Sequence, residues 1–345
     1  MSTKRNVPSA ELRKPDAEGS ALTMTAVERD AYGSADHLEV RAAARPTATG
    51  ADVLVAVSAA GLDRGAWHVM TGQPYLMRIA GFGLRRPKNP GLGSELAGVV
   101  EAVGPDVTGL APGDAVFGIG RASFAEFSLA SAGKLAQMPA NVTYVQAAAV
   151  PVSGLTALQA LRDKGRVRAG QSVLIIGASG GVGTLAVQIA KAFGAEVTGV
   201  CSTAKVDLVR SLGADHVIDY TTGDITEGDR RYDLVLDIGG NRSVTTLRRM
   251  LAPKGTLVIV GGEGGGRWFG IGRQLRAIAL SPFVRQRLGT LIASENSKDL
   301  DTLRAMVEDG SITPVIDRTC SLSDVPDAMR DLEAGRVRGK VVFAV

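Results

Sequence analysis

Short apolar runs separated by turn residues fill the first part of the chain, from Leu22 to Val150. The runs LTMTAVERD, HLEVRAA, ADVLVAVSAAGL, GSELAGVVEAVG, PGDAVFGIG and FAEFSLA are β-like, with Gly33, Pro46 and Gly50 among the turn residues. Repeated short strands with this punctuation predict a mostly β domain of about 130 residues.

The pattern changes over residues 172–205. SVLIIG has the composition of a strand buried on both faces, GASGGVG of a tight turn, and TLAVQIAKAF the apolar spacing of a helix. EVTGVC adds a second strand, and the unit has the length of a strand–turn–helix–strand motif. HVIDY (216–220), YDLVLDIGG (232–240) and TLVIVGG (256–262) predict further parallel strands, with helices around 204–212, 243–251 and 298–309. The fold class is therefore α/β, with a doubly wound parallel sheet.

The glycines of the turn indicate a phosphate site. Ala178, Gly180 and Gly183 occupy the positions of a G-x-G-x-x-G fingerprint, in which the small residues make the turn, admit a pyrophosphate and allow close helix packing. Backbone N–H groups at the start of the helix would then face the anion. The alternative is a tight turn without a ligand. We expect the dinucleotide site to include Ala178, Ser179, Gly180, Gly181, Val182 and Gly183.

The end of the second strand distinguishes the two dinucleotides. NAD sites usually place a carboxylate there to hold the ribose hydroxyl, but this chain has Ser202, Thr203 and Lys205, with no carboxylate before Asp207. Two hydroxyls and an ammonium suit a 2′-phosphate, so NADPH is favoured over NADH. Ser202 and Thr203 could also cap the helix that begins near Ala204, and both roles are compatible.

Composition sets the broad class. The chain has 345 residues, enough for two domains, with 45% hydrophobic and 4% aromatic residues and a net charge of +4 that does not argue for nucleic acid. Cys201 and Cys320 form no metal or disulfide pattern, which fits a reducing compartment. Residues 1–20 are polar and predict a disordered tail, and no run is long enough for a membrane span. We expect a cytoplasmic protein.

A family resemblance rests on several ordered motifs. AAGLDRGAWHVMTG, GSELAGVVEAVG, PGDAVFG, FAEF, VPVSGLTALQAL and GASGGVG follow one another as in the medium-chain dehydrogenase/reductase superfamily, and the chain most resembles its zinc-independent, quinone oxidoreductase-like branch. The resemblance covers about residues 21–345. It implies a GroES-like β domain at 21–150, completed by 311–345, and a Rossmann NADP-binding domain at 151–310.

The resemblance also implies further cofactor contacts. Thr156 would meet the nicotinamide end, and Lys340 would reach the cofactor, although a solvated lysine is the alternative. The 2′-phosphate would be surrounded by Ser202, Thr203, Lys205 and Tyr220, and the nicotinamide half lined by Gly239, Gly261 and Gly262.

Zinc ligands separate the branches of this superfamily. Where zinc enzymes carry Cys and Gly-His-Glu, this chain has Asp63 and Gly93-Ser94-Glu95, and no cysteine precedes residue 200. Asp63, His68 and Glu95 could in principle be recruited, but we predict a metal-free protein. Reduction of a quinone or α,β-unsaturated carbonyl spreads the developing charge over a conjugated system, so it needs only modest hydrogen-bond help.

Three residues are candidates for the chemistry. His68 takes the position of a Tyr in relatives and could donate a proton, or it only packs on Trp67 or bonds a carbonyl. Asp63 replaces a frequent Asn and could instead pair with Arg64. Ser94 offers a hydroxyl to the pocket or caps a turn.

The resulting hypothesis is a zinc-independent NADPH oxidoreductase acting on a quinone, enone or similar small electrophile. The alternatives are an enoyl-thioester or alkenal reductase and a non-catalytic NADPH-sensing protein, and homodimers are usual in the family. The arginine-rich segment 266–290 is interpreted as a solvated helix near the cleft or a subunit contact, or as a membrane-surface helix. Segment 78–90 is expected at the rim of the substrate pocket.

Overall fold

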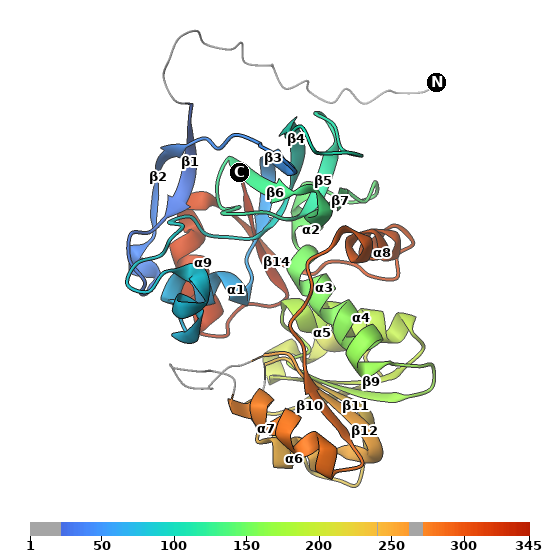
Figure 1. Ribbon diagram of the computed structural model, residues 1–345. Coiled ribbons are helices and arrows are strands. Elements are labelled where there is room, and N and C mark those ends of the chain that lie inside the picture. Colours follow the sequence, from blue (N-terminus) through green and yellow to red (C-terminus); the bar gives the residue numbers. More distant parts are fainter. Residues whose placement is uncertain (1–21, 240, 262–271) are drawn as a thin grey trace, which may run out of the picture.

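The computed structural model describes residues 22–239, 241–261 and 272–345. The tail predicted at residues 1–20, Gly262 and the first part of segment 266–290 lie outside these ranges. The described chain forms two sheet-centred units, one above the other in Figure 1. Within it, no helix is long and apolar enough to cross a bilayer.

The upper unit is built on a seven-stranded sheet. Its path runs β14-β15-β3-β4-β5-β7, and β6 pairs with β3. Most residues of β3 and of the first half of β4 are buried, and Phe117, Phe124 and Phe343 are fully buried in the same unit. The strands are β3 (Asp52–Gly61), β4 (Glu95–Val103), β5 (Ala115–Ile119), β6 (Phe127–Ser131), β7 (Leu135–Gln137), β14 (Ile316–Ser321) and β15 (Lys340–Ala344).

Smaller elements surround this sheet. The hairpin-like pair β1 (Thr23–Glu28) and β2 (Glu39–Ala44) is antiparallel. The helices α1 (Arg64–Thr71), α2 (Tyr144–Ala148) and α9 (Val325–Glu333) complete the unit. Strands β14 and β15 come from the C-terminal part of the chain, so residues 52–137 and 316–344 contribute to one sheet.

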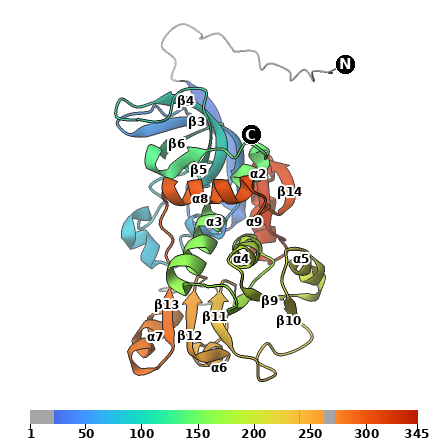
Figure 2. The ribbon, with the colours of Figure 1, turned by 90° about the vertical axis from the view of Figure 1, so that its right-hand side faces the viewer.

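The lower unit has six parallel strands in the order β10-β9-β8-β11-β12-β13, the order of a doubly wound dinucleotide-binding sheet. Helices pack on both faces (Figure 2), and the central strand β8 is fully buried at Val173, Leu174 and Ile175. The predicted fold class is therefore confirmed. The strands are β8 (Ser172–Ile176), β9 (Glu196–Cys201), β10 (His216–Asp219), β11 (Tyr232–Asp237), β12 (Leu251–Ile259) and β13 (Arg287–Thr290). The helices are α3 (Pro151–Gln159), α4 (Gly181–Ala192), α5 (Val206–Ser211), α6 (Val244–Arg249), α7 (Gly272–Leu280) and α8 (Ser297–Glu308).

The arginine-rich segment 266–290, interpreted from the sequence as a helix, contains both a helix and a strand in its described part. It contains helix α7, but it ends in the edge strand β13, which pairs with β12 from Arg287 to Thr290. The sequence RLGT is too short and polar to show a strand pattern. Strand β12 also begins at Leu251 rather than at residue 256, because helix α6 already ends at Arg249.

The segment between α9 and β15 connects the two units. The backbone N–H of Gly339 donates to the carbonyl of Ser179 at 2.9 Å, and Gly180 and Gly339 form a parallel bridge. The C-terminal part of the upper unit therefore docks on the glycine-rich turn of the lower unit.

Candidate active site

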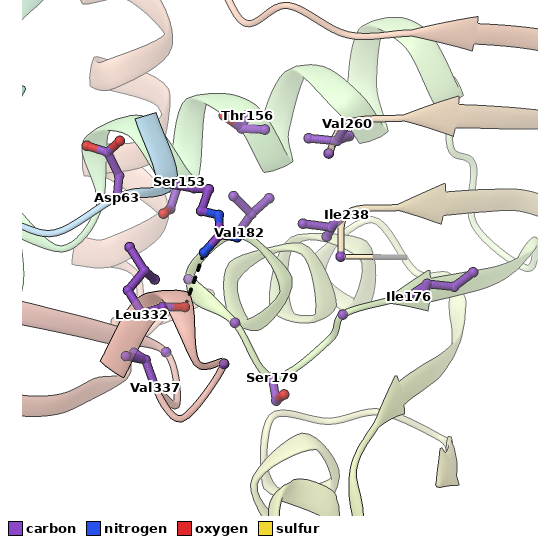
Figure 3. Close-up of a pocket in the computed structure, with 18 of the residues that line it drawn as sticks. Asp63, Ser153, Thr156, Ile176, Ser179, Val182, Ile238, Val260, Leu332 and Val337 are labelled. Atoms are coloured by element: carbon purple, nitrogen blue, oxygen red, sulfur yellow. Dashed lines mark hydrogen bonds between the residues drawn. The ribbon is translucent and has the colours of Figure 1, made fainter. Parts of the chain in front are cut away.

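A cavity of about 870 Å³ lies between the two units (Figure 3). It opens at the carboxyl ends of β8, β9, β11 and β12, where the strand order reverses and doubly wound sheets bind their ligands. Helices α1 and α3 and residues 335–341 close the other side. Thirteen of the predicted site residues line it: Asp63, His68, Thr156, Ser179, Gly180, Gly181, Val182, Ser202, Lys205, Tyr220, Gly239, Gly261 and Lys340.

The glycine-rich turn differs from the prediction in the first slot of the fingerprint. Gly177 has φ +88° and lines the cavity, whereas Ala178, placed in the first slot of the fingerprint, is fully buried beneath it. A left-handed backbone suits glycine, so Gly177 makes the turn and Ala178 packs under it. Gly183 does not line the cavity either. A Cβ on Gly183 would stand 2.1 Å from the carbonyl oxygen of Gly177, so this glycine serves the close packing of helix against strand.

The start of helix α4 fits a pyrophosphate. Gly180 is its N-cap in extended conformation, and the first backbone N–H groups of the helix have no partner within it. A Cβ on Gly180 would meet only the Gly177 oxygen, at 3.7 Å, so the space above this residue is open to a ligand. The turn therefore provides both the donors and the room that a diphosphate needs.

Lys205 lies at the end of the cavity nearest β9. Its Nζ donates to the carbonyls of Gly335 at 3.1 Å and Val337 at 2.8 Å, which leaves one of its three N–H bonds for a ligand. Burial, together with the charge of Arg338, lowers the pKa of Lys205. An anion bound to Lys205 would offset the repulsion between Lys205 and Arg338.

The two hydroxyl residues predicted beside Lys205 differ in their position. Ser202 lines the cavity and makes no side-chain capping bond, whereas the Thr203 hydroxyl donates to Asp219 at 2.5 Å and lies outside the lining. The Thr203 hydroxyl thus binds a carboxylate at the end of β10, and its predicted phosphate contact has no support in this arrangement. Tyr220, 54% exposed, lines the cavity.

The opposite half of the cavity is mostly apolar. Ile176, Ile238 and Val260, at the ends of β8, β11 and β12, face it together with Thr156 of α3 (Figure 3). The Thr156 hydroxyl donates to the Val152 carbonyl at 2.7 Å. Such a surface suits a flat heteroaromatic ring with few polar anchors.

Lys340 is buried rather than solvated. Its Nζ donates to Oε2 of Glu95, while Oε1 of Glu95 accepts from the backbone N–H groups of Val152 at 2.8 Å and Ser153 at 3.3 Å. Burial holds the pKa of Glu95 above its ordinary value, and the charge of Lys340 opposes this shift. One carboxylate therefore joins β4, β15 and the start of α3 next to the cavity, a role that the sequence did not reveal.

The side chains of Asp63 and Ser94 are hydrogen-bonded to each other. Asp63 caps helix α1 by accepting from the Ala66 N–H at 3.0 Å, and its other oxygen accepts from the Ser94 hydroxyl at 2.9 Å. The Ser94 hydroxyl is bound in this way and does not line the cavity, so its predicted contact with substrate has no support in this arrangement. Arg64, considered as a partner of Asp63, donates to the Leu332 carbonyl at 3.2 Å, the dashed line in Figure 3.

His68 lies on the cavity-facing side of α1. Its Nδ1 is 2.8 Å from the carbonyl oxygen of Gln73, and its ring packs edge-on to Trp67. Because a carbonyl only accepts, Nδ1 carries the hydrogen, and His68 can donate from Nε2 only as an imidazolium. Both packing contacts considered for His68 therefore exist, and they orient the ring in the cavity wall.

The possible metal ligands are engaged elsewhere. Asp63 binds a helix N-terminus and Ser94, Glu95 binds Lys340, and Nδ1 of His68 binds a carbonyl. No group of three His, Cys, Asp or Glu side chains comes together among the described residues. This donor set does not suit a zinc ion.

Segment 78–90 does not reach the cavity. It follows α1, and none of its residues belongs to the lining. The segment therefore does not form part of the cavity wall, and its predicted position at the rim stays a prediction. The loop instead lies against Tyr32, whose hydroxyl donates to the carbonyls of Phe82 and Gly83.

Comparison with known proteins assigns the family. The alcohol dehydrogenase GroES-like domain matches residues 49–153, and the zinc-binding dehydrogenase family matches residues 212–343. The mitochondrial NAD(P)H oxidoreductase RTN4IP1 of Mus musculus is 37% identical over 279 residues, covering 74% of this chain and 70% of that protein. The quinone oxidoreductase structure from Coxiella burnetii has a TM-score of 0.83 at 29% identity, covering 94% of this chain and 100% of that one.

A polyketide synthase protein is also similar. The spectinabilin polyketide synthase system protein NorB of Streptomyces orinoci is 37% identical over 311 residues, which cover 88% of this chain but only 13% of NorB. The chain belongs to the medium-chain dehydrogenase/reductase superfamily, in its zinc-independent, quinone oxidoreductase-like branch. It shares the oxidoreductase fold of that branch.

Proposed function

We propose that the protein transfers hydride from NADPH to a quinone, enone or similar conjugated carbonyl bound between the two units. The observation that carries the proposal is the composition of the cavity wall. One end has phosphate-binding geometry and cations, and the other is apolar around a few oriented polar groups. The names of the mouse and Coxiella relatives support a nicotinamide cofactor and a quinone acceptor.

The preference for NADPH rests on charge at the Lys205 end. Among the described residues that line the cavity, Asp63 is the one acidic side chain, and it caps helix α1. Lys205 retains a donor, and Arg338 is near enough to influence its pKa. A 2′-phosphate would gain charge-assisted hydrogen bonds there, whereas a ribose hydroxyl has no carboxylate to bind.

In the apolar half of the cavity, the protein's side chains would exclude water and supply a proton. When bound, the nicotinamide supplies the hydride. Ile176, Ile238 and Val260 provide an apolar floor that excludes water, and His68 can hold a proton at Nε2 for an acceptor oxygen. A conjugated acceptor needs little more, because its negative charge is delocalised as it forms.

The test of function combines cofactor binding with turnover. NADPH fluorescence is titrated first, and absorbance decay is then followed with small quinones, enones and an enoyl thioester. Decay with quinones or enones supports the proposal. Saturable decay with the thioester alone would favour the enoyl reductase alternative, which the similarity to NorB suggests. Tight binding without decay on any acceptor would contradict reductase activity and favour a sensor.

The cofactor preference is tested with Lys205→Ala and Arg338→Ala. Each should weaken NADPH binding about tenfold, the cost of a charge-assisted bond, and leave NADH within about twofold. Arg338→Ala is informative because Arg338, unlike Lys205, donates to no carbonyl of segment 335–337 among the described contacts. Lys298→Ala, an exposed lysine on α8, is the charge-matched control. Equal losses for both dinucleotides would refute the phosphate assignment.

A further inference from the structure

The loop at residues 76–88 exposes an unusual amount of apolar surface. Leu76 is 40% exposed, Ile79 70%, Phe82 45% and Leu84 66%. Single exposed apolar residues are common, but four large ones within nine residues form a patch of the kind that marks an interaction site. The loop follows α1 in the chain, and in Figure 2 its light-blue ribbon lies at the edge of the upper unit.

The loop is held in this conformation by its polar groups. The Tyr32 hydroxyl donates to the carbonyls of Phe82 at 2.7 Å and Gly83 at 2.9 Å. The guanidinium of Arg78 lies over the rings of Tyr32 and Tyr75, 4.3 and 4.6 Å from their centroids, and donates to two carbonyls at the end of α1. The hydrogen-bonding groups thus face the protein, while the apolar side chains face outward.

Cations border the apolar patch without opposing charge. Arg85, Arg86 and Lys88 are exposed, and among the described residues their side chains make no hydrogen bond or ion pair. The sequence has no Asp or Glu from residue 64 to residue 94. Arg86 acts on Asp30, but the carboxylate of Asp30 is already bound by two nitrogens of Arg41.

We propose that this loop docks the protein on an anionic lipid surface. Ile79, Phe82 and Leu84 would enter the headgroup–acyl boundary, and Arg85 and Arg86 would bind lipid phosphates. The exposed apolar side chains thus match the acyl region of such a surface, and the basic side chains match its phosphate groups.

A second copy of the chain is a poorer occupant. A two-fold contact through the same patch would bring the cations of both copies together, and the stretch supplies no carboxylate to pair them. Docking through this loop would also affect the position of the cavity relative to the lipid. The loop leaves α1 directly after the turn whose Gln73 carbonyl holds His68, so the cavity wall would lie close to the lipid.

The experiment measures binding of the full chain to vesicles and needs no turnover. Vesicles of phosphatidylcholine, alone or with phosphatidylserine, are sedimented with the wild-type protein at low and high salt. Arg85→Ala/Arg86→Ala should weaken binding to the anionic vesicles about 25-fold, a factor of about five for each cation. Ile79→Ser/Leu84→Ser should weaken it at least about tenfold.

The control is Arg249→Ala/Lys298→Ala, which removes the same charge from exposed sites elsewhere and should retain binding within about twofold. Unchanged circular dichroism melting shows that each variant folds. The proposal is overturned if the wild type does not sediment with anionic vesicles, or if the control loses as much binding as the loop variants. It is also overturned if the wild type is a dimer that Ile79→Ser/Leu84→Ser converts to monomer, because the patch then belongs to a second copy.

Discussion

The buried pair of Lys340 and Glu95 allows a quantitative prediction. Glu95 has an exposed fraction of 0% and Lys340 of 3%, so Lys340→Met leaves a carboxylate in the interior without its cation. Breaking a buried pair in this way costs about 3–5 kcal/mol. The N–H groups of Val152 and Ser153 still bind Oε1 and offset part of that cost, so we expect about 3 kcal/mol.

The loss should depend on pH with a definite sign. Without Lys340, the pKa of Glu95 in the folded protein rises further above its ordinary value of 4.5. Between the unfolded and folded pKa values, the folded protein then binds a proton that the unfolded chain does not. The free energy of unfolding of Lys340→Met should therefore recover as pH falls from about 7 toward about 5, and fall again as pH rises.

The assay is thermal and urea unfolding of the whole chain, followed by tryptophan fluorescence across this pH range. A loss of about 3 kcal/mol lowers the melting temperature by about 6–12 °C. Glu95→Gln/Lys340→Met has no buried charge and should regain most of the stability without the pH dependence, and Lys298→Met should change neither. A loss below about 1 kcal/mol, or one that is the same at all pH values, would refute this account of the pair.

Substitutions at four residues give three further tests of the site. Gly183→Ala should destabilise the fold by about 1–3 kcal/mol because its Cβ would meet the Gly177 carbonyl, whereas Gly180→Ala should melt like the wild type but weaken dinucleotide binding about tenfold; the reverse order would contradict the roles given to the two glycines. His68→Phe keeps the packing on Trp67 and should lower turnover about tenfold or more with cofactor affinity unchanged, and a normal rate would leave His68 a packing residue. Asp63→Ala should cost about 1–2 kcal/mol in urea unfolding through the lost helix cap, and Asp63→Asn much less, so equal losses would count against the capping role.

Most of the lower unit could be predicted because its strands are strongly patterned. Residues 172–176 are a continuous apolar run, and a strand buried on both faces requires such a run. Strand β13 has only four residues and begins with Arg287, so its assignment depends on pairing with β12, which sequence pattern does not show. The first slot of the fingerprint was assigned one residue too late for a related reason. Whether Gly177 or Ala178 makes the turn is decided by backbone angles, and both residues are small.

The partners of polar site residues could not be predicted. Glu95 and Lys340 are 245 positions apart, and Thr203 meets Asp219 only because β9 and β10 are neighbours in the sheet. Sequence reasoning found the residue types that chemistry requires, but whether each side chain is available depends on contacts made by the folded chain. That is why Ser94 and Thr203 are engaged elsewhere.

Residues 335–341 explain why the cavity belongs to neither unit alone. Their carbonyls bind Lys205 beside β9, Gly339 bonds to Ser179 of the glycine-rich turn, and Lys340 pairs with Glu95 of the upper sheet. A dinucleotide lying along the lower sheet would therefore contact groups whose positions depend on the docked C-terminal segment. Ligand binding and docking of this segment must then favour each other, because the cavity that binds the ligand is complete only when the segment is in place.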